Sequence, residues 1–292
     1  MIPYFILDQF SLGPVKIYTW GLFVGLGFSA GYLLFYYLAK KESLAPAKIA
    51  GPALAIFAGA LLGAKVLAVA QLPGGLFKNI NLIFSQHSGA MFLGGVLGAI
   101  LFGWGYIKLA KLNLWRIADL LVLPMALGIG IGRIACVLTN EHQGALTSLP
   151  WGILWPDGTL RHPVGIYEAL VGFGLLAAFR FLFFSPPQLR GRLRGGADSG
   201  ILVLARDESL TKVRTPDTTS PSSSSTKGER IDGRMFLLFL ISYSAIRFFL
   251  EFTRVASGPL ADPRWGVFSV SQWLALLIIA GSLLFFIKKV VK

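Results

Sequence analysis

The sequence is short of charged residues, of cysteine and of histidine. Charged residues make up 14% of its 292 residues, against about 25% in a typical soluble domain. Its one cysteine, Cys136, excludes an intramolecular disulfide and a cysteine-rich metal site. Its three histidines occur without an HExxH segment or a clustered acidic motif, so we expect no metal and no other cofactor.

Apolar residues fill the chain instead. Hydrophobic residues account for 54% of the sequence, and the mean hydropathy is +0.67. A soluble protein of this length cannot bury so much apolar surface, so the sequence predicts an all-α polytopic membrane protein. The net charge of +13 also occurs in nucleic-acid-binding proteins. In a membrane protein, however, Lys and Arg mark the cytoplasmic loops, so we expect the membrane, and no nucleic acid, as a partner.

Seven apolar runs have about the 20 residues that a transmembrane helix needs. They are residues 16–38, 49–71, 90–110, 117–138, 164–184, 234–252 and 268–287. Basic residues gather in the loops after the first, third and fifth runs and at the C-terminus. By the positive-inside rule these parts are cytoplasmic, and the N-terminus is outside.

Two connecting segments differ from the rest of the predicted single membrane domain, residues 1–292. Residues 139–163 place the turn signal 156–158 between PWGILW and TLRHP, which predicts a small external hairpin. Residues 185–233 are polar, and residues 215–227 read TPDTTSPSSSSTK. Because such a composition cannot bury apolar area, we predict a disordered cytoplasmic insertion there.

Small residues recur at helical spacing within the predicted spans. The pairs four residues apart are Gly21 and Gly25, Gly59 and Gly63, and Gly94 and Gly98. This spacing lets helix backbones approach one another and predicts close packing. The GIGIG run at 128–132 lies inside an apolar helix rather than between a strand and a helix, so it is not a nucleotide-binding loop.

Charged residues inside a span are costly, and they are usually functional or paired. Those within the predicted spans are Lys65, Asp119, Arg133, Glu168, Arg180, Arg247 and Glu251. Asp119 lies near a cytoplasmic span end, and we expect it to be solvated. Lys65 and Arg180 are expected to snorkel or to pair with another group.

Arg133 and Arg247 lie at comparable outer depths in the fourth and sixth spans. Arginine binds phosphate through two parallel donors and keeps its charge, so two arginines at one depth suit a shared anion. Glu251 follows Arg247 by four residues on the same helix face, and Tyr243 precedes it by four. Spacing alone leaves two interpretations open: a structural Arg–Glu pair, or a site for a phospholipid headgroup.

Five stretches resemble bacterial prolipoprotein diacylglyceryl transferases. Residues 128–170 contain a G-R-I stretch, a P-W-G strand and an R-H-P…Y-E element, as the signature region of that family does. Residues 243–254, YSAIRFFLEFTR, resemble the family's late Y…R-F…E-F motif. Residues 18–32 and 91–101 are similar to its first and third spans, and residues 269–277 to the start of its last span.

This resemblance implies a seven-span enzyme of the bacterial inner membrane that faces the cell exterior. Such enzymes move the diacylglyceryl group of phosphatidylglycerol to the lipobox cysteine of a prolipoprotein, forming a thioether and releasing glycerol phosphate. The family's essential arginines match Arg133 and Arg247, and its late acidic position matches Glu251. These three are the expected catalytic residues. The residues expected to bind substrate are Arg133, Arg247, Tyr243, Glu141, His162 and Trp20.

The chain departs from the family pattern at several positions. Leu93 stands where many members have the His proposed as a base, and Trp20 stands at a common Tyr position. The family's N-G-E segment reads Thr-Asn-Glu at 139–141, and the Ser-Gln that often follows H-P reads Val-Gly at 164–165. These departures leave the identity of the general base open among Glu251, Glu141 and His162.

Three further alternatives concern Cys136 and the class of function. Cys136 lies three residues after Arg133, but we expect it to be a small packing residue, since the nucleophile of the reaction belongs to the substrate. A catalytically inactive phospholipid-binding protein derived from the same family fits the sequence as well. A transporter of an anionic solute would have internal repeats or helices broken in matching places, and we find neither.

Overall fold

The computed structural model describes most of the chain. The described residues are 1–42, 44, 46–85, 89, 91–184, 233–256 and 263–290. The chain divides into two units, Met1–Phe179 with Asp232–Lys292, and Arg180–Ile231. The predicted insertion at 185–233 lies outside the described residues apart from Gly233.

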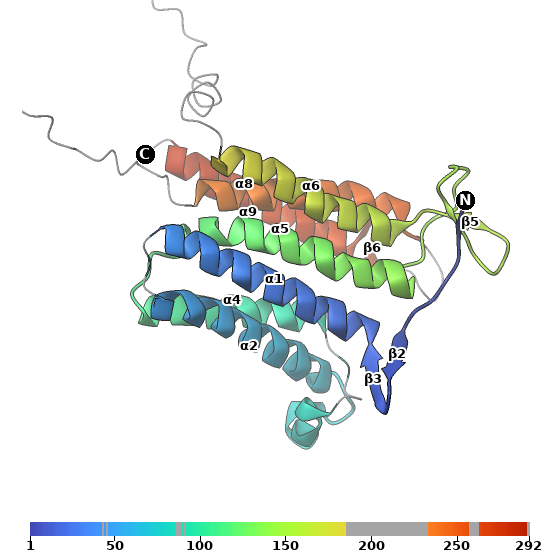
Figure 1. Cartoon of the computed structure of the whole chain (residues 1–292), viewed down its shortest axis with the longest axis horizontal. Coiled ribbons are helices and arrows are strands. Elements are labelled where there is room, and N and C mark those ends of the chain that lie inside the picture. The colour runs from blue at the N-terminus through green and yellow to red at the C-terminus, as the bar shows by residue number, and fades with distance from the viewer. Residues whose placement is uncertain are drawn as a thin grey trace, which may run out of the picture. The chain divides into compact units, whose positions relative to one another are not determined.

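Seven long helices form the main unit, and each corresponds to one predicted span. They are α1 (Thr19–Lys41), α2 (Pro46–Ala70), α4 (Phe92–Leu109), α5 (Leu114–Thr139), α6 (Val164–Phe184), α8 (Arg234–Leu250) and α9 (Val270–Val290). Figure 1 shows them as coiled ribbons, in which α1 packs against α5, α2 against α4, and α8 against α9. The protein is therefore a multi-pass helical membrane protein, as predicted.

The predicted count of seven membrane spans is not confirmed. Among the described residues, six helices are long and apolar enough to cross a membrane. The exception is α4, because its apolar part, Leu93–Leu109, is shorter than the others. The predicted start of the first span at residue 16 is also wrong. Residues 15–18 form strand β3 (Val15–Tyr18), which pairs antiparallel with β2 (Gln9–Leu12) before α1 begins.

Close packing of glycines joins α2 to α4, as predicted. A Cβ on Gly98 would lie 2.0 Å from the carbonyl oxygen of Gly59, and a Cβ on Gly63 would lie 2.2 Å from that of Gly94. Only glycine fits such an approach, so the two backbones are in direct contact. The same prediction is wrong for Gly21 and for its partner at 25, where a Cβ would meet nothing within 4 Å.

The GIGIG run of α5 packs against two helices, α1 and α6. A Cβ on Gly27 of α1 would lie 3.0 Å from the carbonyl oxygen of Gly128. On α6, a Cβ on Gly172 would lie 2.4 Å from the backbone nitrogen of Gly130. The second approach brings α6 against the part of α5 that precedes Arg133.

The predicted hairpin is present within residues 139–163. Strand β4 (Ile153–Leu154) pairs antiparallel with β5 (Leu160–Arg161). An unexpected third strand, β1 (Ile2–Pro3), runs parallel to β4, so the N-terminal residues belong to the same small sheet. At the turn, hydrogen bonds from Thr159 and Arg161 lower the pKa of Asp157 to about 2.

Short elements connect the remaining helices. They are α3 (Gly75–Lys78) and η1 (Ile80–Phe84) between α2 and α4, η3 (Glu251–Thr253) directly after α8, and the antiparallel pair β6 (Arg264–Trp265) and β7 (Phe268–Ser269) before α9.

Asp119, which we expected to be solvated, is half-buried and also has partners within the protein. Its carboxylate accepts hydrogen bonds from the backbone N–H groups of Gly233 at 2.7 Å and Phe236 at 2.9 Å. These groups lie at the start of α8, where unpaired N–H groups and the helix dipole favour a negative charge. Asp119 of α5 therefore caps α8. Lys65 pairs as expected, since its Nζ donates to the carbonyl oxygen of Ser85 at 2.9 Å.

Candidate functional site

The candidate site lies where α5 and α8 end and α6 begins. Arg133 is in the last two turns of α5, Glu168 is in the second turn of α6, and Arg247 is in the last turn of α8. The chain direction of these helices therefore brings together three charged residues that are far apart in the sequence.

Glu168 is the centre of an ion-pair network. Its side chain is 3% exposed, and its Oε2 lies 2.9 Å from Nη1 of Arg133. Its Oε1 lies 3.8 Å from Nε of Arg247 and 3.9 Å from Nη1 of Arg254. Among the described residues neither carboxylate oxygen has a hydrogen-bond partner of good geometry. Three guanidinium groups are thus held around one carboxylate mainly by charge.

Arg247 and Glu251 form the predicted pair on one helix face. Nη1 of Arg247 lies 2.5 Å from Oε2 of Glu251, and the Glu251 side chain is 2% exposed. The cluster therefore contains three arginines and two glutamates, which leaves one positive charge in excess. An excess charge on half-buried arginines is costly, so this cluster favours an anion beside it.

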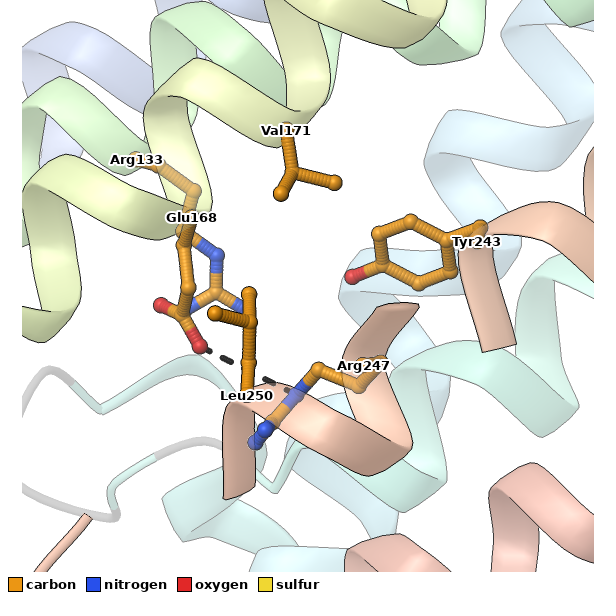
Figure 2. A pocket seen from close by; sticks show the side chains of 6 residues that line it. All are labelled: Arg133, Glu168, Val171, Tyr243, Arg247 and Leu250. Atoms are coloured by element: carbon orange, nitrogen blue, oxygen red, sulfur yellow. Dashed lines mark ion pairs between the residues drawn. The ribbon is translucent and has the colours of Figure 1, made fainter. Parts of the chain in front are cut away.

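A small pocket opens on this cluster. It is lined by Arg133, Glu168, Val171, Tyr243, Arg247 and Leu250. Figure 2 shows the Tyr243 hydroxyl turned toward the space that the two arginines and Glu168 border. The structure thus brings Arg133, Arg247 and Tyr243 together, as the sequence predicted. Glu251 forms an ion pair with Arg247.

Two further residues belong to the cluster: Cys136 in the last turn of α5, and His142 just after the helix ends. Nε2 of His142 lies 3.4 Å from Nη1 of Arg133, and its Nδ1 lies 3.3 Å from Nη2 of Arg254. Burial, followed by the charges of Arg254, Arg133 and Arg247, lowers the pKa of His142 to about 3. Its imidazole is therefore neutral at physiological pH. Sγ of the buried Cys136 accepts a 3.8 Å hydrogen bond from Nη1 of Arg133.

Backbone pairing holds the His142 loop in place. Ala145 N–H donates to the carbonyl oxygen of Thr253 at 2.8 Å, and Val255 N–H donates to that of Gln143 at 3.2 Å. On the other side, a Cβ on Gly144 would lie 2.1 Å from the backbone oxygen of His162. Only glycine fits between the two neighbouring segments, and this fixes the loop against both the hairpin and the segment after α8.

Three of the sequence-predicted substrate residues lie outside the pocket. Glu141 is exposed in the His142 loop, and Trp20 is 50% exposed in the first turn of α1. His162 belongs to a separate group, in which its Nδ1 lies 3.2 Å from the Tyr167 hydroxyl. That hydroxyl also accepts a 2.9 Å hydrogen bond from Nε1 of Trp151.

Three residues of the cluster were not chosen from the sequence. Glu168 was noted only as a charge within a span and as part of the Y-E element, although its buried position signals a structural or functional partner. Arg254 is the last residue of the YSAIRFFLEFTR stretch, but nothing in its spacing singles it out as a site residue. His142 has no periodicity or motif of its own, so sequence reasoning had no signal for it.

Among the residues that the structure describes, Cys136, Glu141 and His142 form a group that could hold a metal ion. Their ligand atoms all lie within 4.8 Å of one another. Arg133, however, already contacts both the Cys136 sulfur and the His142 imidazole. A cation there would be repelled by the guanidinium, so the arrangement favours anions. The expectation that the protein uses no metal stays a prediction.

The fold and the site define a class before any comparison: a multi-pass helical membrane protein with a buried, arginine-rich site suited to an anion. The family model for prolipoprotein diacylglyceryl transferase matches residues 8–201 and 221–288. The chain therefore belongs to the prolipoprotein diacylglyceryl transferase family and is a membrane transferase.

Individual relatives agree with the family match. The phosphatidylglycerol–prolipoprotein diacylglyceryl transferase of Solidesulfovibrio magneticus is 30% identical over 193 residues, which cover 63% of this chain and 73% of the relative. That of Clostridioides difficile is 25% identical over 276 residues, covering 94% and 92%. That of Clostridium tetani is 27% identical over 285 residues, covering 94% and 95%.

Proposed function

We propose that this protein moves the diacylglyceryl group of phosphatidylglycerol to the lipobox cysteine thiol of prolipoproteins. One observation carries the proposal beyond family membership. The cluster of Arg133, Arg247 and Arg254 with Glu168 and Glu251 has one excess positive charge, and the phosphodiester of phosphatidylglycerol has one negative charge. A lipid phosphate in this pocket would therefore balance the buried charge.

During the reaction, negative charge develops on this same phosphate. The cysteine sulfur attacks the glycerol carbon that is bonded to the phosphate oxygen, and the new S–C bond is the thioether. The C–O bond breaks, and its electron pair stays on the phosphate. Glycerol phosphate leaves, so negative charge on the phosphate grows from the diester to the monoester.

Arg133 and Arg247 would bind that phosphate more tightly as its charge grows. An interaction that strengthens in the transition state raises the rate, whereas equal binding of substrate and transition state does not. The same positive field favours the thiolate form of an incoming cysteine. We assign to both arginines the phosphate contacts, and to Tyr243 a hydrogen bond from the pocket wall.

Glu251 would orient Arg247 rather than take a proton. Its Oε2 is already engaged by Nη1 of Arg247, and its side chain is 2% exposed. The remaining predicted contacts, Glu141, His162 and Trp20, are proposed to meet the peptide or the rim of the lipid site. Glu141 and His162 both belong to segment 139–163, which also contains His142, a neighbour of the pocket residue Arg133.

The proposed location is a bacterial inner membrane, with the N-terminus and segment 139–163 outside and the C-terminus in the cytoplasm. The basis is the asymmetry of basic residues between the two sets of loops. Maleimide labelling of a Ser222→Cys variant in intact cells tests this orientation. Labelling from outside would overturn it, and labelling only after lysis would support it.

Label transfer tests the activity itself. Purified protein in vesicles is given phosphatidylglycerol labelled in its acyl chains and a lipobox peptide, and labelled peptide is measured. We expect transfer to the cysteine peptide and none to a peptide with serine at that position. Lipid binding without transfer would instead establish the alternative, a catalytically inactive phospholipid-binding member of the family.

A further inference from the structure

The contacts of His142 are mismatched in their hydrogen-bonding chemistry. Each of its two ring nitrogens faces an arginine, Nε2 toward Arg133 at 3.4 Å and Nδ1 toward Arg254 at 3.3 Å. A guanidinium donates hydrogen bonds and cannot accept them. Since a neutral imidazole has one N–H and one accepting nitrogen, one of these contacts places an N–H against an N–H.

A phosphate oxygen removes this mismatch. It accepts hydrogen bonds both from guanidinium groups and from an imidazole N–H. A phosphodiester bound in the pocket at Arg133 and Arg247 would draw the Arg133 guanidinium toward its oxygens. Nε2 of His142, which faces Arg133, would then be released with its lone pair available.

The charges around His142 would change at the same time. Arg133 reaches it from α5, Arg247 and Arg254 from the end of α8 and the segment that follows, and Glu251 from η3. Their combined field is positive and, together with burial, keeps the imidazole neutral. A bound phosphate adds negative charge beside these arginines, so it raises the pKa of His142.

The neighbours of His142 on its own segment complete its surroundings. The Cys136 sulfur and a Glu141 carboxylate oxygen lie within 4.8 Å of a His142 ring nitrogen. Cys136 is buried and is held by Arg133, whereas Glu141 is exposed. Because the imidazole is neutral, neither residue forms an ion pair with His142.

Resting on the proposed transfer reaction, we propose that His142 accepts the proton of the prolipoprotein thiol, and does so once the lipid phosphate occupies the arginine cluster. The S–H proton passes to the released ring nitrogen, and the sulfur attacks the phosphate-linked carbon. The broken C–O bond leaves its electron pair on the phosphate. The imidazolium then gives its proton to glycerol phosphate, whose second pKa is about 6, or to water.

His142 is better placed to act as the base than Glu251, Glu141 or His162. Glu251 is engaged by Arg247, and His162 is engaged by the Tyr167 hydroxyl. It also orders the reaction. Because Arg133 both lines the phosphate pocket and contacts His142, the thiol is deprotonated after the lipid has bound.

Transfer by His142→Gln and His142→Asn variants tests the proposal. At pH 7 we expect the rate with a cysteine lipobox peptide to fall about a hundredfold, within the usual contribution of a general base. The loss should shrink as the pH rises past the thiol pKa of about 8.5. A selenocysteine peptide, whose selenol ionises at neutral pH, should restore the rate. Gln143→Asn, the next residue of the same loop, is the matched control.

Two results would overturn the proposal. One is a His142→Gln rate equal to wild type from pH 6 to pH 9. The other is a loss that persists with selenocysteine and at high pH, because a structural role gives that pattern. Absence of transfer by wild type would instead overturn the proposed function.

A measurement on the wild-type protein does not depend on how the variants fold. The chain has three histidines, so the imidazole nitrogen signals in NMR spectra are few enough to assign. We expect the titration of His142 to move to higher pH when phosphatidylglycerol replaces phosphatidylcholine in the nanodisc. An unchanged titration would contradict the coupling between phosphate and base.

Discussion

Oε2 of Glu168 lies 2.9 Å from Nη1 of Arg133, and this buried pair joins α6 to α5 at the candidate site. The carboxylate also faces Arg247 and Arg254 at longer distances. Glu168 therefore balances part of the arginine charge, and a bound phosphate would balance the rest.

Replacing either pocket arginine with lysine should impair transfer strongly. Arg133→Lys or Arg247→Lys keeps the charge but loses the planar pair of donors. Loss of one contact to a developing phosphate costs roughly 3 kcal/mol, about a hundredfold in rate. Transfer to a lipobox peptide by correctly inserted protein is the measurement. Arg116→Lys, at the opposite end of α5 with its side chain 44% exposed, is the control. Near wild-type transfer by both Arg133→Ala and Arg247→Ala would show that the arginines are structural.

Removing the charge of Glu168 should destabilise the protein. Glu168→Gln leaves three arginines facing one carboxylate, and breaking a buried ion pair typically costs about 3 kcal/mol. We expect a lower Tm in phosphatidylcholine nanodiscs and a larger rise in Tm on adding phosphatidylglycerol than in wild type. Glu141→Gln, which changes an exposed carboxyl, is the stability control. An unchanged Tm would mean that the network contributes no net stability.

The role of Glu251 can be separated from that of Arg247 by comparing two variants. Glu251→Gln keeps a hydrogen-bond acceptor for Nη1 of Arg247 but removes the negative charge. If Glu251 orients Arg247, Glu251→Gln should reduce transfer by about tenfold, which is less than the reduction expected for Arg247→Lys. A reduction as large as that of Arg247→Lys, relieved by raising the pH, would make Glu251 the base instead.

A methyl group at Gly144 should disturb the His142 loop without preventing insertion. A Cβ there would lie 2.1 Å from the backbone oxygen of His162, so the two segments must separate. We expect Gly144→Ala to lower transfer by more than about tenfold, since a displacement of about 1 Å near a catalytic group can cost a hundredfold. Gly174→Ala in α6, where a Cβ meets nothing within 4 Å, should retain activity. Equal activity of the two variants would show that the loop tolerates movement.

Shortening the polar insertion should leave transfer intact. The family model matches residues 8–201 and 221–288, and residues 202–220 lie outside that match. These residues lie outside the part of the chain that the structure describes. We expect a deletion of 202–220 to insert normally and to transfer label at a rate within about twofold of wild type. Normal insertion with lost transfer would assign this segment a function.

The sequence by itself determined the helical membrane architecture and half of the candidate site. Apolar runs of about 20 residues have few alternatives to a membrane helix, because the backbone must satisfy its own hydrogen bonds in lipid. The pairing of Arg247 with Glu251 follows from the four-residue repeat of the helix, and the structure has it at 2.5 Å. A turn signal between two apolar segments likewise sufficed for the β4–β5 hairpin.

Tertiary structure alone decided which distant residues share the pocket. Glu168 meets Arg133 because Gly172 packs on Gly130 and sets the register of α6 against α5. Asp119 caps α8, since α8 begins beside it. His142 lies between two arginines because its loop is paired with the segment after α8. Such relationships depend on contacts between elements far apart in the chain, and local periodicity contains no information about them.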